Sequence, residues 1–535
     1  MRAYSRTMVM LVLGASALAL YLPFLGNPLV FDDLPYFQNG GLQDVFIAGF
    51  SLERRWFPYF MTAWVELIFD NSVPIQRLIN LGLHLACALT LYAFIRQISN
   101  HAAPHVNNDR AALAAALLFL LHPLAVYAVG YLIQRTILMA TLFGLLSLSA
   151  YFDGLITRKK TYFVLSAIFY FLSAHSKEHA VLIPTVALLM TPLAGHLDRK
   201  MVMRLIFPFA LYLPVFVFII FNSTGVVGHA YEAESANFLS AHVGAAGDRD
   251  VWLLSVATQA SLYFKYLLLT FFPLPAWMSV DLRVPFADQL TDLKYVLGVG
   301  TYLAYGVAAL VLVAKGGRSA LLGLALVSPW LMFGVEFSTV RIQEPFVLYR
   351  AYLWIPLLFL LVPVLTNKLS GNIFWVLILG VSITFAVASR DRLESFSSAF
   401  KLWNDAVQKL PDGKGVPGVE RAYFNRGNEY IALKDTPAAI ADYTRAIELN
   451  PNLSALYLNR AYVFWQSHDY SKAEQDVDAA IRLDAASAQA YYMSGLINQK
   501  KSRPSEAYRD FERACKLGSQ GACYANNSLK DYVNP

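Results

Sequence analysis

The sequence predicts an all-α protein made of a polytopic membrane helical bundle followed by a soluble α-solenoid. Of its 535 residues, 57% are hydrophobic and only 15% are charged, whereas about a quarter of the residues of an average soluble protein are charged. Residues 1–390 read as apolar runs separated by short loops, and residues 391–535 read as a polar helical sequence. From about residue 420, small and aromatic residues recur with a 34-residue period, which is typical of helical repeats.

The apolar runs predict about eleven transmembrane helices. The first run carries no charge from Met8 to Phe31, so it is long enough to cross a hydrocarbon core about 30 Å thick. We expect a retained first helix rather than a signal peptide, because no clear small-residue cleavage site precedes Pro28. The expected helices cover residues 8–26, 74–96, 110–124, 136–154, 162–175, 179–194, 204–222, 293–314, 318–337, 351–366 and 371–389.

A twelfth stretch, 252–273, is expected to be re-entrant or interfacial. Only with this assignment do the short loops rich in Lys and Arg all fall on one side of the membrane, as cytoplasmic loops do. Irregular backbone at membrane depth is tolerated where protein or a water-filled cavity surrounds it. This topology predicts a cavity and places the C-terminal domain on the side opposite the N-terminus.

The predicted topology gathers ionisable residues on one membrane face. Asp32 and Asp33 directly follow the first helix. Five further residues of interest on this face are His122, Arg135, Lys177, Glu178 and Arg350. Ionisable groups near membrane depth are costly and usually face a bundle interior or a cavity, so we expect a polar site here. The formal net charge of +6 reflects mainly short-loop Lys and Arg, which favours contact with membrane lipids and gives no indication of nucleic-acid binding.

The C-terminal period has the length of the tetratricopeptide (TPR) repeat. Small residues recur at Gly427, Ala461 and Gly495, and larger ones at Tyr443, Val477 and Phe511. We expect a linker over 391–419 and three helical hairpins over 420–535. The groove of such a solenoid binds an extended peptide or a partner protein, and a stability or oligomerisation module is an equally good interpretation.

Several motifs in the first 370 residues resemble the GT-C glycosyltransferases, in particular the transmembrane-and-TPR O-mannosyltransferase group and its bacterial relatives. Tyr349 stands where such proteins often carry an acidic residue before Arg350. The motifs that carry the resemblance are Phe31-Asp32-Asp33, Phe57-Pro58-Tyr59, Leu121-His122-Pro123-Leu124, Gln134-Arg135, Ser176-Lys177-Glu178, Tyr266-Leu267-Leu268-Leu269 and Met278-Ser279-Val280-Asp281.

The resemblance implies transfer of a sugar from a polyprenyl-phosphate-linked donor to Ser or Thr hydroxyls of an exported protein. Asp32 is the expected base, and Asp33 is expected to orient it, to contact the acceptor or to help hold a divalent metal, Mg²⁺ or Mn²⁺. A carboxylate accepts the hydroxyl proton, and cations stabilise charge on the leaving phosphate. The residues expected to bind the donor phosphate or sugar are His122, Arg135, Lys177, Glu178 and Arg350. The sequence names no acceptor-binding residue.

Simpler interpretations compete at each of these positions. Asp32 and Asp33 could form an ordinary helix-exit turn, and His122 could satisfy backbone groups at a helix end. Lys177 and Arg350 could be interfacial snorkelling residues, and Arg54 and Arg55 are expected to contact headgroups.

Two rival functions remain open for the whole chain. The first uses the same donor with a lipid or cell-envelope glycan as acceptor, and the second is a non-catalytic membrane scaffold. We expect a bacterial inner membrane with the site and the TPR domain in the periplasm, with an endoplasmic reticulum membrane and lumenal repeats as the alternative. Cys515 and Cys523 resemble the paired cysteines of Sel1-like repeats, and such a disulfide requires an oxidising compartment.

Overall fold

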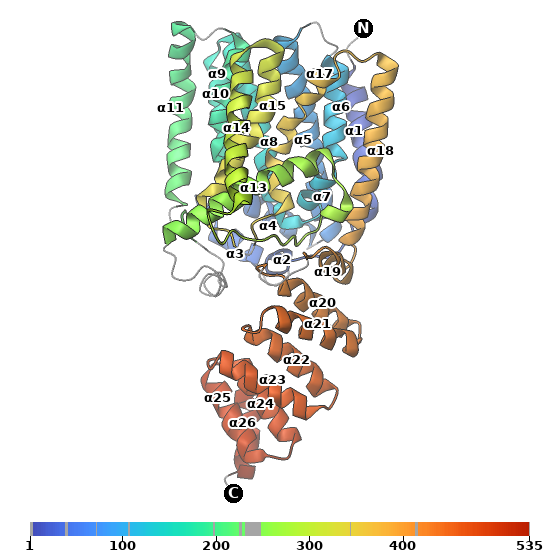
Figure 1. The fold of residues 1–535 in the computed structure, drawn as a ribbon, viewed down its shortest axis with the longest axis vertical. Helices are drawn as coiled ribbons and strands as arrows, with labels where there is room; N and C mark the ends of the chain where they lie inside the picture. The colour runs from blue at the N-terminus through green and yellow to red at the C-terminus, as the bar shows by residue number, and fades with distance from the viewer. Residues whose placement is uncertain are drawn as a thin grey trace. The chain divides into compact units, whose positions relative to one another are not determined.

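The computed structural model describes residues 4–37, 41–70, 72–104, 108–195, 198–223, 227–229, 248–342, 344–411 and 416–533. Within these ranges the chain is helical and contains no β-strand. It forms two compact units, Met1–Ser398 and Ala399–Pro535 (Figure 1). Residues 412–415 of the expected linker lie outside the described residues.

The first unit is a bundle of long helices with short helices at both of its ends (Figure 1). Its longer helices are α1 (Arg6–Tyr21), α4 (Trp56–Phe69), α5 (Val73–Ala102), α6 (Asn108–Leu120), α8 (Arg135–Thr157), α9 (Lys160–Ser176), α10 (Ile183–Ala194), α11 (Arg199–Phe221), α13 (Asp248–Phe271), α14 (Leu293–Ala314), α15 (Gly317–Phe333) and α18 (Gly371–Ser395). The shorter ones include α2 (Asp33–Phe37), α3 (Gly41–Ala48), α7 (Pro123–Val129), α16 (Ile355–Leu358), α17 (Leu361–Leu365) and the 3₁₀ helices η2 (Leu132–Gln134), η3 (Glu178–Leu182), η5 (Gly334–Ser338) and η6 (Leu348–Leu353).

Helix α8 lies at the centre of this unit and packs closely against α9. A Cβ atom added to Gly154 of α8 would lie 2.7 Å from the Phe163 ring of α9, so the contact requires glycine. Ser147 and Ser166 hydrogen-bond across the same interface at 3.1 Å. Small and hydroxyl side chains of this kind allow two apolar helices to approach closely.

Seven described helices, rather than the eleven expected, are long and apolar enough to cross a membrane by length and composition. An eighth is α6 with α7 if this pair, bent by 59°, is one span. The prediction overcounted for local reasons. The stretch 351–366 breaks into η6, α16 and α17, with Pro356 and Pro363 in the short helices. Helix α9 has 17 residues and α10 has 12.

The stretch expected to be re-entrant forms the continuous helix α13, which ends just before Phe272-Pro273. It is not among the seven apolar helices. Its inner face carries the buried polar side chains of Ser255, Thr258 and Gln259. Gln259 donates to the Pro345 carbonyl at 2.8 Å, so α13 holds the segment that leads into η6.

The second unit repeats a helical hairpin three times. Its helices are α19 (Ala399–Gln408), α20 (Glu420–Ala432), α21 (Thr436–Leu449), α22 (Ser454–Gln466), α23 (Tyr470–Leu483), α24 (Ala488–Lys500), α25 (Pro504–Lys516) and α26 (Gln520–Val533). The hairpin turns place Lys434, His468 and Ser502 in the left-handed region, with φ of 62°, 63° and 60°. One ion pair also recurs, Arg426 with Asp442 at 2.7 Å and Arg460 with Asp476 at 2.8 Å.

Small residues meet aromatic rings inside these hairpins, as the period predicts. A Cβ atom on Gly427 would lie 2.9 Å from the Tyr443 ring, and one on Gly495 would lie 2.5 Å from the Phe511 ring. We therefore expect Gly495→Ala to destabilise the third hairpin by about 1–3 kcal/mol, because the ring must move in a packed core. Hydrogen exchange of α24 and α25 in the full chain measures this loss.

Gly521→Ala in α26 is the matched control, because its new Cβ would lie 3.7 Å from the nearest atom, in Tyr492. Alanine favours a helix over glycine, so this variant should exchange no faster than the parent. Equal exchange rates in both variants would show that the Gly495 contact does not limit the packing.

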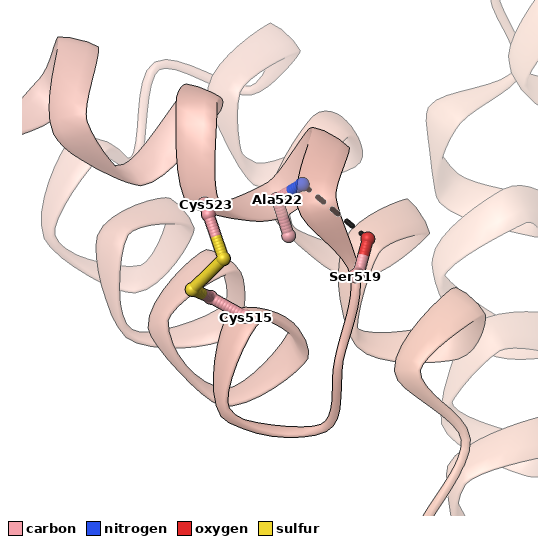
Figure 2. The surroundings of a disulfide bond; sticks show 4 residues. All are labelled: Cys515, Ser519, Ala522 and Cys523. Atoms are coloured by element: carbon pink, nitrogen blue, oxygen red, sulfur yellow. Dashed lines mark hydrogen bonds between the residues drawn. A yellow bond between two sulfur atoms is a disulfide. The ribbon is translucent and has the colours of Figure 1, made fainter.

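A disulfide joins Cys515 at the end of α25 to Cys523 in α26, with the two Cα atoms 4.7 Å apart (Figure 2). Ser519 lies in the connecting turn and caps α26 by accepting a hydrogen bond from the Ala522 N–H at 3.3 Å. The pairing implied by the resemblance to Sel1-like repeats is present. It ties the last helix to the third hairpin.

Candidate functional site

The loop that carries the two aspartates is held by a buried arginine of α5. The guanidinium of Arg77 donates to the carbonyls of Leu25 at 3.2 Å and Pro28 at 2.7 Å, and also to that of Asn27. Phe31 follows with a φ of +48°, which is uncommon for a non-glycine residue and marks a constrained turn. The turn fixes the positions of Asp32 and Asp33 beyond the end of the first helix.

The two aspartates lie in different environments. Asp33 is fully buried, and its carboxylate accepts hydrogen bonds from the backbone N–H groups of Ile133 at 2.8 Å and Leu132 at 3.3 Å. Burial raises the pKa of Asp33 to about 7, although these N–H groups oppose the rise. Asp32 is exposed. Asp33 therefore positions η2, and Asp32 presents the carboxylate that a ligand can reach.

Two tyrosines connect Asp32 to Lys177. The backbone N–H of Asp32 donates to the Tyr131 hydroxyl at 3.0 Å. The Tyr131 ring meets the Tyr349 ring edge-on, with centroids 6.1 Å apart, and the Lys177 ammonium lies 5.8 Å from the Tyr349 centroid. Asp32, through its backbone N–H, and Lys177 thus border one tyrosine wall made of Tyr131 and Tyr349.

Lys177 is a buried cation in a largely positive environment. Lys177 is only 5% exposed. Among the described residues, no carboxylate lies within ion-pair distance of its ammonium. Burial, and then the charges of Arg55, Arg350 and Arg341, lower the pKa of Lys177 to about 7, while Glu178 opposes the shift. A buried cation without a direct counter-ion is costly, so the position favours an anionic ligand.

Glu178 holds a second cation beside Lys177. Its carboxylate pairs with both Nε and Nη2 of Arg55, the former at 3.0 Å. Arg55 has a φ of +62°, and its backbone N–H donates to the His175 carbonyl at 3.0 Å. Arg55 therefore belongs to this cluster, whereas the sequence predicted a headgroup contact for it.

The cation cluster consists of Lys177, Arg55, Arg341 and Arg350. Glu336 holds the last two of these cations. It is fully buried in η5, and its carboxylate lies 2.9 Å from Arg341 Nε, 3.2 Å from Arg350 Nη1 and 3.1 Å from His179 Nε2. The acidic partner of Arg350 is thus supplied by another segment of the chain, and position 349 is free to carry the tyrosine.

Arg135 and His122 have their polar atoms engaged within the protein. Arg135 is 2% exposed and donates to Asn80 at 2.8 Å, Thr62 at 3.1 Å and Gln76 at 2.7 Å. His122 caps α7 by accepting from the Leu124 N–H at 3.2 Å, and its Nε2 lies 2.9 Å from the Thr270 carbonyl. Both residues thus have a packing role within the protein, and the donor-binding role that their motifs imply stays a prediction.

The aspartate pair does not fit a divalent metal. One carboxylate, that of Asp33, is already bound by backbone N–H groups, which leaves Asp32 alone to supply ligands. Among the described residues, no group of three or more His, Cys, Asp or Glu side chains is arranged to hold an ion, whereas Mg²⁺ and Mn²⁺ prefer several oxygen ligands. We derive no step through a metal.

Five residues of the site were not among the predicted site residues, namely Arg55, Tyr131, His179, Glu336 and Arg341. Glu336 carried a usable signal, because it is a lone carboxylate inside the apolar run 318–337, and such residues are functional candidates by default. Arg55 and Tyr131 carried none, because each joins the site through contacts more than 90 residues away in sequence.

Comparisons with known proteins match the C-terminal repeats. A family model described as tetratricopeptide repeat matches residues 420–453. The E3 ubiquitin-protein ligase CHIP of Arabidopsis thaliana is 36% identical over 107 residues, covering 19% of this chain and 38% of that protein. Serine/threonine-protein phosphatase 5 of Rattus norvegicus is 34% identical over 107 residues, covering 20% of this chain and 21% of that protein. The chain therefore spans well under half the length of these relatives.

Solved structures of TPR domains are also similar to this chain. The Arabidopsis OM64 TPR domain is 29% identical and covers 21% of this chain and 96% of its own, with a TM-score of 0.21. The second TPR domain of human RPAP3, in complex with an HSP70 peptide, is 29% identical and covers 20% of this chain and 92% of its own, with a TM-score of 0.20. The family match confirms the predicted TPR repeat in the second unit.

Proposed function

We propose that the chain is an integral-membrane glycosyltransferase of the GT-C type. In this proposal it moves a sugar from a polyprenyl-phosphate-linked donor to Ser or Thr hydroxyls of an exported protein, and its TPR repeats recruit the acceptor. The observation that carries the proposal is the buried Lys177 ammonium, which has no carboxylate at ion-pair distance among the described residues and borders the same tyrosine wall as Asp32.

The outward faces of the first unit support a membrane location. The exposed apolar side chains of α14 include Leu297, Leu303 and Val307, and those of α18 include Val376 and Leu377. Contiguous apolar surface of this extent marks an interaction with a membrane or with another protein. The helices involved have the length that a bilayer requires.

Asp32 and the cations have complementary tasks in the proposed reaction. The acceptor oxygen bonds to the anomeric carbon as the bond from that carbon to the phosphate oxygen breaks. The hydroxyl proton passes to the exposed Asp32 carboxylate, and the phosphate leaves with the bonding electron pair. Lys177, Arg55 and Arg350 stabilise the charge that grows on this leaving phosphate.

The TPR unit supplies an extended surface for the acceptor. Stacked helical hairpins form a concave face of the kind that binds extended polypeptide. The disulfide between Cys515 and Cys523 favours the periplasm or another oxidising compartment for this unit. Within the proposal, the acceptor is therefore a protein after export.

Mass spectrometry of exported proteins from cells with and without this chain tests the proposed function. We expect a hexose- or pentose-sized mass on Ser or Thr peptides only in cells that contain the chain. The same mass on a lipid or envelope glycan would indicate the alternative acceptor. Identical glycan profiles in both cell types would contradict the enzyme and favour a scaffold.

A further inference from the structure

Five aromatic side chains form a ladder along α3, α4 and the segment between them. The aromatic ladder consists of Phe46, Phe50, Trp56, Phe60 and Trp64. Trp56 stacks on Phe60 with centroids 4.7 Å apart, and Phe50 meets Trp56 edge-on at 4.9 Å. Phe46 stacks on Phe60 at 5.9 Å and meets Trp64 edge-on at 5.8 Å. The rings therefore form one connected surface across both helices, which lie side by side (Figure 1).

Helix α4 carries ladder rings on one face and buried side chains on the other, and Phe46 of α3 packs partly against the core. Trp56, Phe60 and Trp64 are spaced four residues apart and so share one face of the helix. The opposite face is buried and includes Thr62, which accepts a hydrogen bond from Arg135. The Trp56 indole N–H donates to the Gly49 carbonyl at 2.6 Å, which fixes the end of α3 against α4.

Both ends of the aromatic ladder are exposed, and one of them adjoins the cation cluster. Trp64, at one end, is 45% exposed, and Phe50, at the other, is 75% exposed, although tryptophan and phenylalanine are usually well buried. Phe50 packs on Trp56, which directly follows Arg55 in the chain, and the Arg55 guanidinium pairs with Glu178 beside Lys177. The ladder and the cation cluster are therefore neighbours along the chain at Arg55 and Trp56.

We propose that the aromatic ladder is the docking surface for the isoprenoid chain of a lipid-phosphate donor. The inference rests on the proposed function and assigns the place of the donor's tail. A polyprenyl phosphate is an amphiphile with one anionic head and one apolar chain. In this proposal the cation cluster binds the head, and the adjacent ladder binds the chain. Rigid rings provide a large contact area at little cost in side-chain entropy.

The ladder differs from the outward faces of α14 and α18. The exposed large apolar side chains of α14 and α18 are all aliphatic, whereas the ladder is built from aromatic rings that hold one another in place. Faces that only meet fluid bilayer lipid need no such mutual contacts. The ordered surface beside Arg55 fits a single chain that is held at its phosphate.

Binding of two lipid phosphates to the full chain in detergent tests this inference. The probes are a long-chain polyprenyl phosphate and geranyl phosphate, which carry the same head but different tail lengths. We expect Trp64→Ala to weaken binding of the long-chain phosphate about tenfold and to change geranyl phosphate binding less than about twofold. Phe216→Ala, an exposed aromatic position of α11, is the control and should change neither affinity.

Other results would contradict the role of the ladder, the proposed function or both. If Trp64→Ala changes neither affinity, the ladder faces bilayer lipid only and the inference fails. If it weakens both phosphates equally, the ladder acts by supporting the cation cluster, and the assignment of the tail fails. If the unaltered chain transfers sugar but Trp64→Ala keeps full long-chain affinity, the proposed function stands without the ladder. Binding of neither phosphate to the unaltered chain overturns both proposals.

Discussion

Asp32→Asn is expected to lower the rate of sugar transfer by about 10³-fold without loss of folding. A positioned general base contributes about 10²–10⁴-fold, and Asn has the shape of Asp but cannot take the acceptor proton. The Asp32 side chain is exposed, and its structural contact is made by the backbone N–H to Tyr131, which the substitution keeps. Glycopeptide yield by mass spectrometry and thermal unfolding of the purified variants provide the two measurements.

Asp33→Asn is the matched comparison, and we expect it to lower the stability of the protein as well as its activity. The Asp33 carboxylate receives backbone N–H groups from Ile133 and Leu132 on separate oxygens. An amide has only one oxygen, so one buried N–H loses its acceptor at a cost of about 1–3 kcal/mol. This variant should lose stability along with activity. Full transfer by Asp32→Asn would exclude Asp32 as the base and assign the proton transfer to another group.

The second unit was the more predictable part of the fold. A TPR hairpin is specified by residues within one 34-residue period, so the pairs Gly427 with Tyr443 and Gly495 with Phe511 are visible as spacings in the sequence and are close contacts in the structure. The left-handed turns at Lys434, His468 and Ser502 were not predicted, because none of them is a glycine or an asparagine.

The first unit was less predictable because hydropathy does not reveal helix breaks. The apolar run 351–366 has the composition of a span, yet prolines divide it into short helices. The run 108–129 bends by 59° at His122 and Pro123, where the histidine ring caps the second helix. In both places a local backbone hydrogen-bonding requirement decides the structure.

The residue types of the candidate site were predictable from the sequence. Which of these residues are structural and which a ligand can reach was not. Adjacent aspartates look equivalent in sequence, and burial separates them into a structural and an accessible carboxylate. Arg135 and Arg350 look alike too, but Arg135 is enclosed by Asn80, Thr62 and Gln76, which lie 55 to 73 residues away. Only tertiary contacts distinguish a packing arginine from one in the cation cluster.

Lys177 should make donor binding depend on pH. Burial, and then the charge of Arg55, lower the pKa of Lys177 to about 7, so its ammonium is fully present below that pH and is lost above it. A bound phosphate favours the charged lysine, and affinity should therefore fall as pH rises, by up to about tenfold per unit. Polyprenyl methyl phosphate is the suitable probe, because a phosphate diester keeps one negative charge from about pH 6 to about pH 9.

Lys177→Arg and Lys177→Met separate the lysine from its titratable neighbours. Arginine stays charged throughout this range, so Lys177→Arg should bind the diester with a nearly flat pH profile. Lys177→Met should also give a flat profile, at an affinity about tenfold to a hundredfold below that of the parent at low pH, because it removes one charge-assisted contact to phosphate. The other groups around the ammonium are Arg55, Glu178, His179, Arg341 and Arg350. A pH slope that survives in Lys177→Arg would transfer the titration to His179, which faces Glu336, and would leave Lys177 as a buried structural cation.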